Sequence, residues 1–194
     1  MQVFLKKCLG ALFLSSVALM SACTLTPKVD DGQLTEKTRV GRFSVLSYDK
    51  RDNVNKDAVQ GGFIWRDLGR TLEVDLTNPL GNTLARVEVS DFQSVLINSS
   101  GQRVVAPSPD DLMAKVLDGR PLPVSGLRYW VKGELMPTTQ ADNVERDEQG
   151  RLLSVYQHGW QVNLSAYDIK GPTRLHLIRN EAVERITVRL TMDQ

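Results

Sequence analysis

The chain has 194 residues, and its charges nearly cancel: 24 lysines and arginines stand against 23 aspartates and glutamates, for a net charge of +1. These charges are interspersed along the sequence, which argues against a nucleic-acid-binding protein, because such proteins carry basic patches. The length suits one domain with a sizeable hydrophobic core.

Residues 1–22 are predicted to be a signal peptide of the lipoprotein type. Lys6 and Lys7 precede an apolar run over residues 9–20, which is too short to span a bilayer comfortably. Small residues occupy the two positions before Cys23, an order similar to the bacterial lipobox, in which the cysteine is acylated and begins the mature chain. Ordinary secretory cleavage just before Cys23 is the alternative.

Lipidation of Cys23 would hold the protein to a membrane through several acyl chains. The next residue is Thr24, where an aspartate would resemble a signal for the inner membrane, so we expect the outer membrane. Residues 23–40 are polar and are predicted to be a lipidated tether. Because Cys8 leaves with the signal peptide, the mature chain has no thiol for a disulfide or a cysteine metal site.

Residues 41–194 form the predicted domain, and its pattern is that of β-strands from Gly41 onward. The polar run over residues 49–57 predicts a loop. Phe63 and Trp65 lie two residues apart, so they are expected on one face of the next strand, with Arg66 on the other.

Residues 71–89 predict a β-hairpin. Apolar and charged residues alternate on both sides of a turn, as in strands with one dry face, and the apolar positions are Leu72, Val74, Leu76, Ala85, Val87 and Val89. Between them, Asn78-Pro79-Leu80-Gly81 has the residue order of a type I turn. Leu80 is a large apolar residue at the tip, where polar residues are usual. It is either a functional contact or one of the single exposed leucines that are common on protein surfaces.

Two short helices are predicted after Pro107. Ser108 or Asp110 is expected to cap a helix over residues 110–117, and Ser125 to cap a second one over residues 127–131. The β pattern then returns to the end of the chain, with apolar residues alternating at Trp160, Val162 and Leu164 and again at Ile186, Val188 and Leu190.

About ten short strands separated by turns predict an antiparallel meander of the mainly β (α+β) class. We expect a single curled antiparallel sheet, an unclosed barrel, with a short helical lid over an apolar cavity. A simple filled core is the alternative. The residues expected to line the cavity are Phe63, Trp65, Leu72, Val74, Leu76, Val87, Val89, Leu112, Val116, Trp130, Trp160, Val162, Leu164 and Val188.

The sequence gives little support for an enzyme or a metal site. Its two histidines, His158 and His176, lack metal-ligand spacing and are expected to be ordinary surface residues. The Asp110-Asp111 pair is explained by helix capping. No GxSxG, P-loop or GxGxxG motif is present.

The ordered set of motifs resembles the LolB family of outer-membrane lipoprotein receptors. The segments that carry the resemblance are the lipobox, Gly41-Arg42-Phe43, Asn78-Pro79-Leu80-Gly81, residues 122–133, Gly159-Trp160-Gln161-Val162 and Tyr167. The resemblance implies an unclosed barrel with helices over its mouth and no nucleotide or other cofactor.

By this resemblance, the protein takes lipoproteins from the soluble periplasmic carrier LolA and places them in the inner leaflet of the outer membrane. It would be lipid-anchored, face the periplasm and bury the acyl chains of its cargo in the apolar cavity. Leu80, on a tip constrained by Pro79, matches the exposed leucine with which the family inserts lipoproteins into the membrane. We expect a monomer. The alternative is a structural lipoprotein that scaffolds a protein partner, in which case its own side chains would fill the curved sheet.

Overall fold

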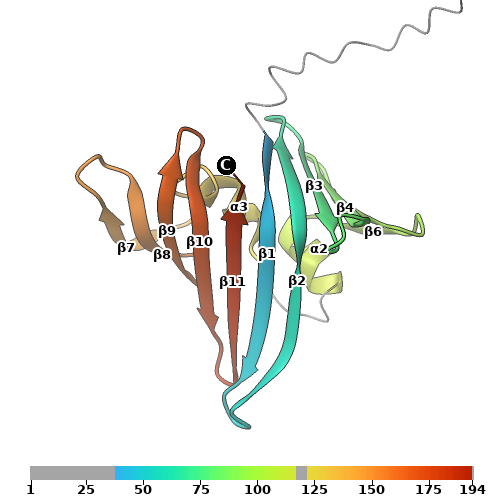
Figure 1. Cartoon of the computed structure of the whole chain (residues 1–194), viewed down its shortest axis with the longest axis horizontal. Coiled ribbons are helices and arrows are strands. Elements are labelled where there is room, and N and C mark those ends of the chain that lie inside the picture. The colour runs from blue at the N-terminus through green and yellow to red at the C-terminus, as the bar shows by residue number, and fades with distance from the viewer. Residues whose placement is uncertain (1–37, 117–121, 194) are drawn as a thin grey trace, which may run out of the picture.

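The computed structural model describes residues 38–116 and 122–193, and in these ranges eleven strands form one antiparallel sheet. The order of the strands is β6-β5-β4-β3-β2-β1-β11-β10-β9-β8-β7, and Figure 1 shows β1 and β11, which pair with each other, at the centre. The strands are β1 Thr38–Asp49, β2 Val54–Asp67, β3 Leu72–Thr77, β4 Thr83–Val89, β5 Ser94–Asn98, β6 Arg103–Ala106, β7 Ala141–Arg146, β8 Leu152–Gln157, β9 Trp160–Asp168, β10 Gly171–Asn180 and β11 Glu184–Met192.

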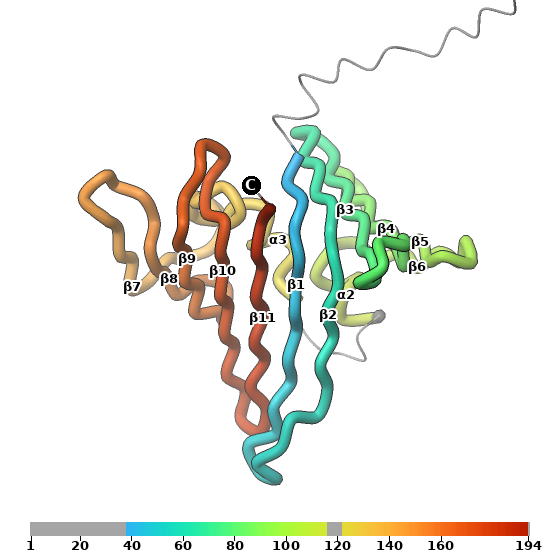
Figure 2. The backbone as a smooth tube through the Cα atoms, viewed as in Figure 1, coloured from blue at the N-terminus to red at the C-terminus, as the bar shows by residue number. Residues whose placement is uncertain are grey.

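The two ends of the sheet, β6 and β7, do not pair with each other, so the sheet is an unclosed barrel of the mainly β class, as predicted. The helices α2 (Pro109–Val116) and α3 (Val124–Trp130) lie on one side of it (Figures 1 and 2). In the residues that the structure describes, no helix is long and apolar enough to cross a membrane.

The loop predicted over residues 49–57 is confirmed only at residues 50–53, and both of its ends are strand instead. β1 continues to Asp49 and β2 begins at Val54, with Asp49 paired to Val54 and Tyr48 to Asn55. Backbone hydrogen bonds between strands need no apolar side chains, and the side chains of β2 from Val54 to Gln60 are exposed, so hydrophobic alternation could not reveal this part of the strand. β1 likewise begins at Thr38, within the stretch that we expected to be tether.

The hairpin predicted over residues 71–89 is confirmed as β3 and β4, with Leu72 paired to Val89 and Val74 to Val87. The Gly81 N–H donates to the Asn78 carbonyl oxygen at 2.9 Å, which closes the turn. The Asn78 side-chain oxygen accepts from the Leu80 N–H at 2.9 Å. Gly81 has φ +87°, a left-handed conformation that favours glycine. Leu80 is held at the tip by these bonds and is 87% exposed.

Helix α2 is capped by Ser108, one of the two residues, Ser108 or Asp110, that the sequence predicts for this role. Its hydroxyl oxygen accepts from the Asp111 N–H at 3.1 Å. The predicted cap at Ser125 is wrong, since α3 begins one residue earlier, at Val124, and has no side-chain cap of its own. Instead the Ser125 N–H donates to Asp110 Oδ1 on α2 at 2.8 Å. Asp110 therefore joins the two helices, because it supplies the acceptor that the start of α3 lacks.

Candidate functional site

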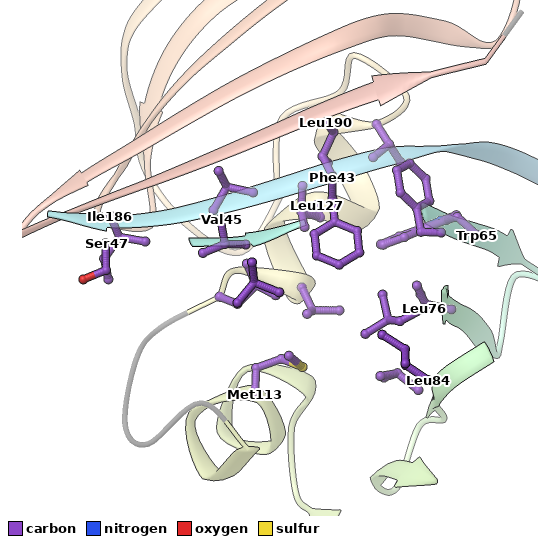
Figure 3. A pocket seen from close by; sticks show the side chains of 18 of the residues that line it. Phe43, Val45, Ser47, Trp65, Leu76, Leu84, Met113, Leu127, Ile186 and Leu190 are labelled. Carbon is purple, nitrogen blue, oxygen red and sulfur yellow. The ribbon is translucent and has the colours of Figure 1, made fainter. Parts of the chain in front are cut away.

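A cavity of about 220 Å³ lies between the sheet and the two helices. Figure 3 shows side chains from β1, β11, α2 and α3 pointing into it, among them Phe43, Val45, Ile186, Met113 and Leu127. Its lining is apolar except for Ser47 and Asp57. The apolar lining residues are Phe43, Val45, Val59, Phe63, Trp65, Val74, Leu76, Leu84, Val87, Met113, Leu122, Val124, Leu127, Val131, Ile186, Val188 and Leu190. Such a lining suits a hydrocarbon guest and offers few polar groups to a polar one.

Cross-strand glycines make room for the two phenylalanines of the cavity. Phe43 faces Gly61 and Phe63 faces Gly41 across the β1–β2 pair. A Cβ atom at Gly61 would lie 3.0 Å from the Phe43 ring and 2.3 Å from the Thr77 carbonyl oxygen. The absence of a side chain thus lets the ring lie close to the strand, as in other aromatic–glycine pairs across strands.

The cavity reaches solvent along β2 and β4. Val59 and Leu84 both line it, and they are 53% and 48% exposed. Leu84 lies near the start of β4, only four residues after Leu80. The exposed tip of the hairpin and one side of the cavity mouth therefore belong to the same short segment of chain.

Six of the residues that the sequence assigned to the cavity line it: Phe63, Trp65, Val74, Leu76, Val87 and Val188. Seven others are buried in the hydrophobic core and do not line the cavity: Leu72, Val89, Leu112, Trp130, Trp160, Val162 and Leu164. The side chain of Val116, like Cys23 and residues 24–37 of the predicted tether, lies outside the described residues. The division shows that a dry face alone does not decide which side chains border open space.

Several lining residues were not assigned to the cavity from the sequence. Phe43 and Val45 are two residues apart on β1, so they lie on the same face of that strand, and Ile186 and Leu190 lie on the same face of β11 as Val188. This alternation could have identified all four as residues of the cavity. Leu84, by contrast, is a half-exposed residue next to a turn, and no periodicity marks it.

Ion pairs connect the lid helices to the strands around the cavity. Arg128 on α3 donates to both carboxylate oxygens of Asp67 at the end of β2, at 2.9 and 3.2 Å. Burial opposes ionisation of Asp67, but the hydrogen bonds from Arg128 and from the Gly69 N–H outweigh it, and the pKa of Asp67 is lowered. The carboxylate is therefore charged at neutral pH and can hold α3 to the sheet.

Only one of the two histidines is exposed as the sequence predicts, and that one is His158. His158 Nε2 lies 3.3 Å from Asp110 Oδ2, so the β8–β9 turn contacts α2. His176 is half-buried, and burial, with a smaller effect of Arg189, lowers its pKa. Among residues 38–116 and 122–193, no group of three histidine, cysteine or acidic residues is placed to hold a metal ion.

Comparison with known proteins gives one consistent result. The family model described as "Outer membrane lipoprotein LolB" matches residues 38–194. The chain is 44% identical over 179 residues to the outer-membrane lipoprotein LolB of Bordetella pertussis, which covers 92% of this chain and 88% of the relative. It is 43% identical over 178 residues to that of Bordetella petrii, covering 91% and 88%. With that of Cupriavidus necator it shares 34% identity over 194 residues, covering 96% and 93%.

Proposed function

Because the chain belongs to the LolB family, which acts in outer-membrane lipoprotein localisation and is not a family of enzymes, we propose that it is a receptor for acylated lipoproteins. It accepts them from a soluble periplasmic carrier, LolA, and passes them to the inner leaflet of the outer membrane. The observation that carries this proposal is the apolar cavity under the lid, with its half-exposed mouth at Val59 and Leu84.

Acyl chains need such a cavity because water is a poor route for them. Each buried CH₂ group is worth roughly 0.8 kcal/mol, so a multiply acylated cargo leaves an apolar environment for water very slowly. A receptor must offer its own apolar surface directly against the carrier. A preference of about 1.4 kcal/mol for the receptor then gives a tenfold bias in its favour.

The lid has to move for the cavity to take a whole cargo. Its volume of about 220 Å³ is smaller than the roughly 300–1,000 Å³ of pockets that enclose drug-sized ligands. Polar ties hold α3, through Arg128 and Asp67 and through Asp110 and the Ser125 N–H. Such ties can break and re-form in water at little net cost. We propose that α2 and the start of α3 swing away from the sheet when acyl chains enter, while Trp130 at the end of α3 stays bonded to Gln157 on β8.

Delivery to the bilayer is assigned to Leu80. Its side chain is exposed at a tip that Pro79 and the Asn78 hydrogen bonds hold in one conformation. Entry of a leucine into the acyl region is favourable, and the short segment from Leu80 to Leu84 places the tip close to the mouth of the cavity. An acylated Cys23 would keep the domain at the outer membrane, facing the periplasm.

Reconstituted transfer tests these assignments. The acceptor is residues 23–194 carrying Cys23→Ala, the donor is purified carrier loaded with a lipoprotein, and liposomes are the final acceptor. Leu76→Trp adds bulk to the cavity wall and is expected to reduce acceptance of cargo. Leu153→Trp makes the same exchange at an exposed position on β8 and is expected to leave transfer unchanged. Leu80→Glu is expected to accept cargo and fail to deliver it.

Each variant can also give the opposite result. If Leu76→Trp accepts cargo as well as Leu153→Trp does, the cavity is not the acyl site. If the parent acceptor, whose cavity is unsubstituted, takes no cargo from the carrier, that result would favour the scaffold role. Equal delivery by Leu80→Glu and the unsubstituted tip would make Leu80 an ordinary turn residue.

A further inference from the structure

Three turns at one end of the sheet carry exposed apolar side chains. Leu68 lies in the β2–β3 turn, Phe92 in the β4–β5 turn and Ile169 in the β9–β10 turn. Phe92 is 85% exposed and Ile169 is fully exposed. Figures 1 and 2 show the β2–β3 and β9–β10 turns at the end where β1 begins. The pairing of Leu72 with Val89 places the β4–β5 turn at the same end. The β2–β3 and β4–β5 turns are also joined there by an ion pair between Arg70 and Asp91 at 3.0 Å.

The opposite end of the central strands is different. The β1–β2 turn there holds Lys50, Arg51, Asp52 and Asn53. Single exposed apolar residues are common on protein surfaces, and Val183 in the β10–β11 turn at this opposite end is one of them. Leu68, Phe92 and Ile169 differ because they gather on three turns at one end of the sheet, which suggests contact with an apolar partner.

Basic side chains lie beneath these apolar tips. An open pocket of about 400 Å³ at this end is lined by Arg39, Lys132 and Lys170, with Asp67 as its carboxylate and Ile169 at its margin. Arg39 is buried and donates to both oxygens of Asp168 and to the Pro172 carbonyl oxygen. Its Nε has no acceptor among the residues that the structure describes. Apolar tips with cations set behind them match a phospholipid surface, where phosphates lie outside the acyl chains.

The position of the tether indicates that the partner of this end of the sheet is the membrane leaflet. The described chain begins with Thr38 at this end, and residues 24–37 connect it to Cys23. Fourteen residues span at most about 50 Å when fully extended. If Cys23 is acylated, as the proposed function requires, this end of the sheet cannot move further than that from the leaflet.

We propose that this end of the sheet, the tether-end surface formed by Leu68, Phe92, Ile169, Lys132 and Lys170, docks on the phospholipid leaflet. The apolar tips enter the interface, and headgroup phosphates lie against the basic side chains. This contact is separate from Leu80. Thr77, which precedes the Leu80 turn, pairs with Gly62 on β2, five residues below Asp67. At about 3.3 Å per residue, the five residues from Asp67 to Gly62 separate the tether-end surface from the start of the Leu80 turn by about 17 Å along β2.

Two contacts at different levels imply two orientations of the domain. With the tether-end surface on the leaflet, Leu80 stays away from the lipid while cargo is received. The domain then tilts about its tether to bring Leu80 to the membrane.

Vesicle binding without carrier or cargo tests the docking. Residues 23–194 carrying Cys23→Ala are floated with vesicles of phosphatidylethanolamine and phosphatidylglycerol. The double variant Phe92→Ser, Ile169→Ser is expected to lose at least about tenfold in affinity, because two large apolar side chains no longer enter the interface. The matched double variant Val54→Ser, Val183→Ser removes half-exposed apolar residues near the opposite end. It is expected to bind as the parent chain does.

Changes in salt and added phosphate separate the charge contribution to vesicle binding from the apolar one and from binding of free phosphate. Binding to these anionic vesicles is expected to weaken as salt rises, and binding to phosphatidylcholine vesicles to weaken less. Inorganic phosphate at matched ionic strength should not displace the vesicles; displacement by phosphate alone would overturn the docking and indicate a phosphate pocket. Full binding by the Phe92 and Ile169 double variant would also overturn the docking. Since the assay contains no cargo, either outcome leaves the proposed lipoprotein transfer standing.

Discussion

The two halves of the sheet have the same alternating pattern, yet one half borders a cavity and the other is filled. On β3 and β4, Val74 and Val87 line open space, whereas on β9 Val162 is buried in solid core. Trp130 and Trp160 are fully buried on the filled side. The difference lies in what covers each half, because the strands themselves present equivalent dry faces.

A hydrogen-bonded side chain closes the filled half. Gln157, at the end of β8, is buried; its Oε1 accepts from Trp130 Nε1 at 3.1 Å and from the Met136 N–H at 3.0 Å. Its Nε2 donates to the carbonyl oxygens of Met136 and Thr139, both at 2.8 Å. The end of α3 and the chain that follows it are thereby fixed onto β8. Over the cavity, by contrast, the start of α3 is joined to α2 by the Ser125–Asp110 hydrogen bond, and Arg128 pairs with Asp67 near the surface, which leaves that part of the cover freer to move.

The largest effect is expected at Gln157. Gln157→Ala should lower the free energy of unfolding by about 3–5 kcal/mol, because it leaves the buried Trp130 N–H and backbone groups of Met136 and Thr139 without partners. Urea unfolding of residues 23–194 carrying Cys23→Ala measures the change. Gln140→Ala is the matched control: Gln140 is exposed and bonds only Asp142 in the described chain, so little change is expected. A loss below about 1 kcal/mol for Gln157→Ala would show that the filled half does not depend on this network.

A matched pair of valines compares the two halves directly. Val162→Ala should cost about 2 kcal/mol, because it opens a void in close-packed core, while Val87→Ala should cost about 1 kcal/mol, because it only enlarges an existing cavity. Both valines are buried, so the comparison holds residue type and exposure nearly constant. Equal losses by urea unfolding would mean that the space beside Val87 is packed in solution and that the two halves do not differ.

The sequence predicts which side chains lie on the dry face of the sheet better than it predicts which helices and loops pack against that face. Alternation found the hairpin that ends in Leu80 and the inward parity of Phe63 and Trp65, because burial on one face imposes a period of two. It could not separate Val74 from Val162, since both obey that period and only the covering chain distinguishes them. Gln157 was missed for a related reason: a glutamine predicts exposure unless its four partners, distant in sequence, are known.

The start of α3 shows the same limit at close range. Ser125 has the residue type and position of a cap, and local reasoning favours it. The acceptor at that point is instead Asp110, fifteen residues earlier on α2. The cap of α2 at Ser108 is local and was predicted. Local signals thus predict contacts within an element, and contacts between elements need the fold.

The smallest effect is expected at the tie between the lid and β2, and it depends on pH. Arg128→Met keeps most of the side-chain length and removes the bonds to Asp67, and should lower the free energy of unfolding by about 1 kcal/mol at pH 7. The folded-state pKa of Asp67 is lowered, so the stability from this pair is present above the ordinary aspartate pKa of about 3.9 and is lost as the pH falls through the lowered value. The gap between parent and variant should therefore close in acid.

Arg70→Met provides the control for that tie. Arg70 pairs with Asp91 in the neighbouring turn, where both side chains are exposed, so its loss should change stability by only about 0.2–0.5 kcal/mol. A gap for Arg128→Met that persists unchanged in acid would assign its effect to packing of the arginine stem and not to charge. Charge at this tie has a further consequence: a looser α3 should admit cargo faster in the transfer assay, whereas Val162→Ala, in the filled half, should leave that rate unchanged.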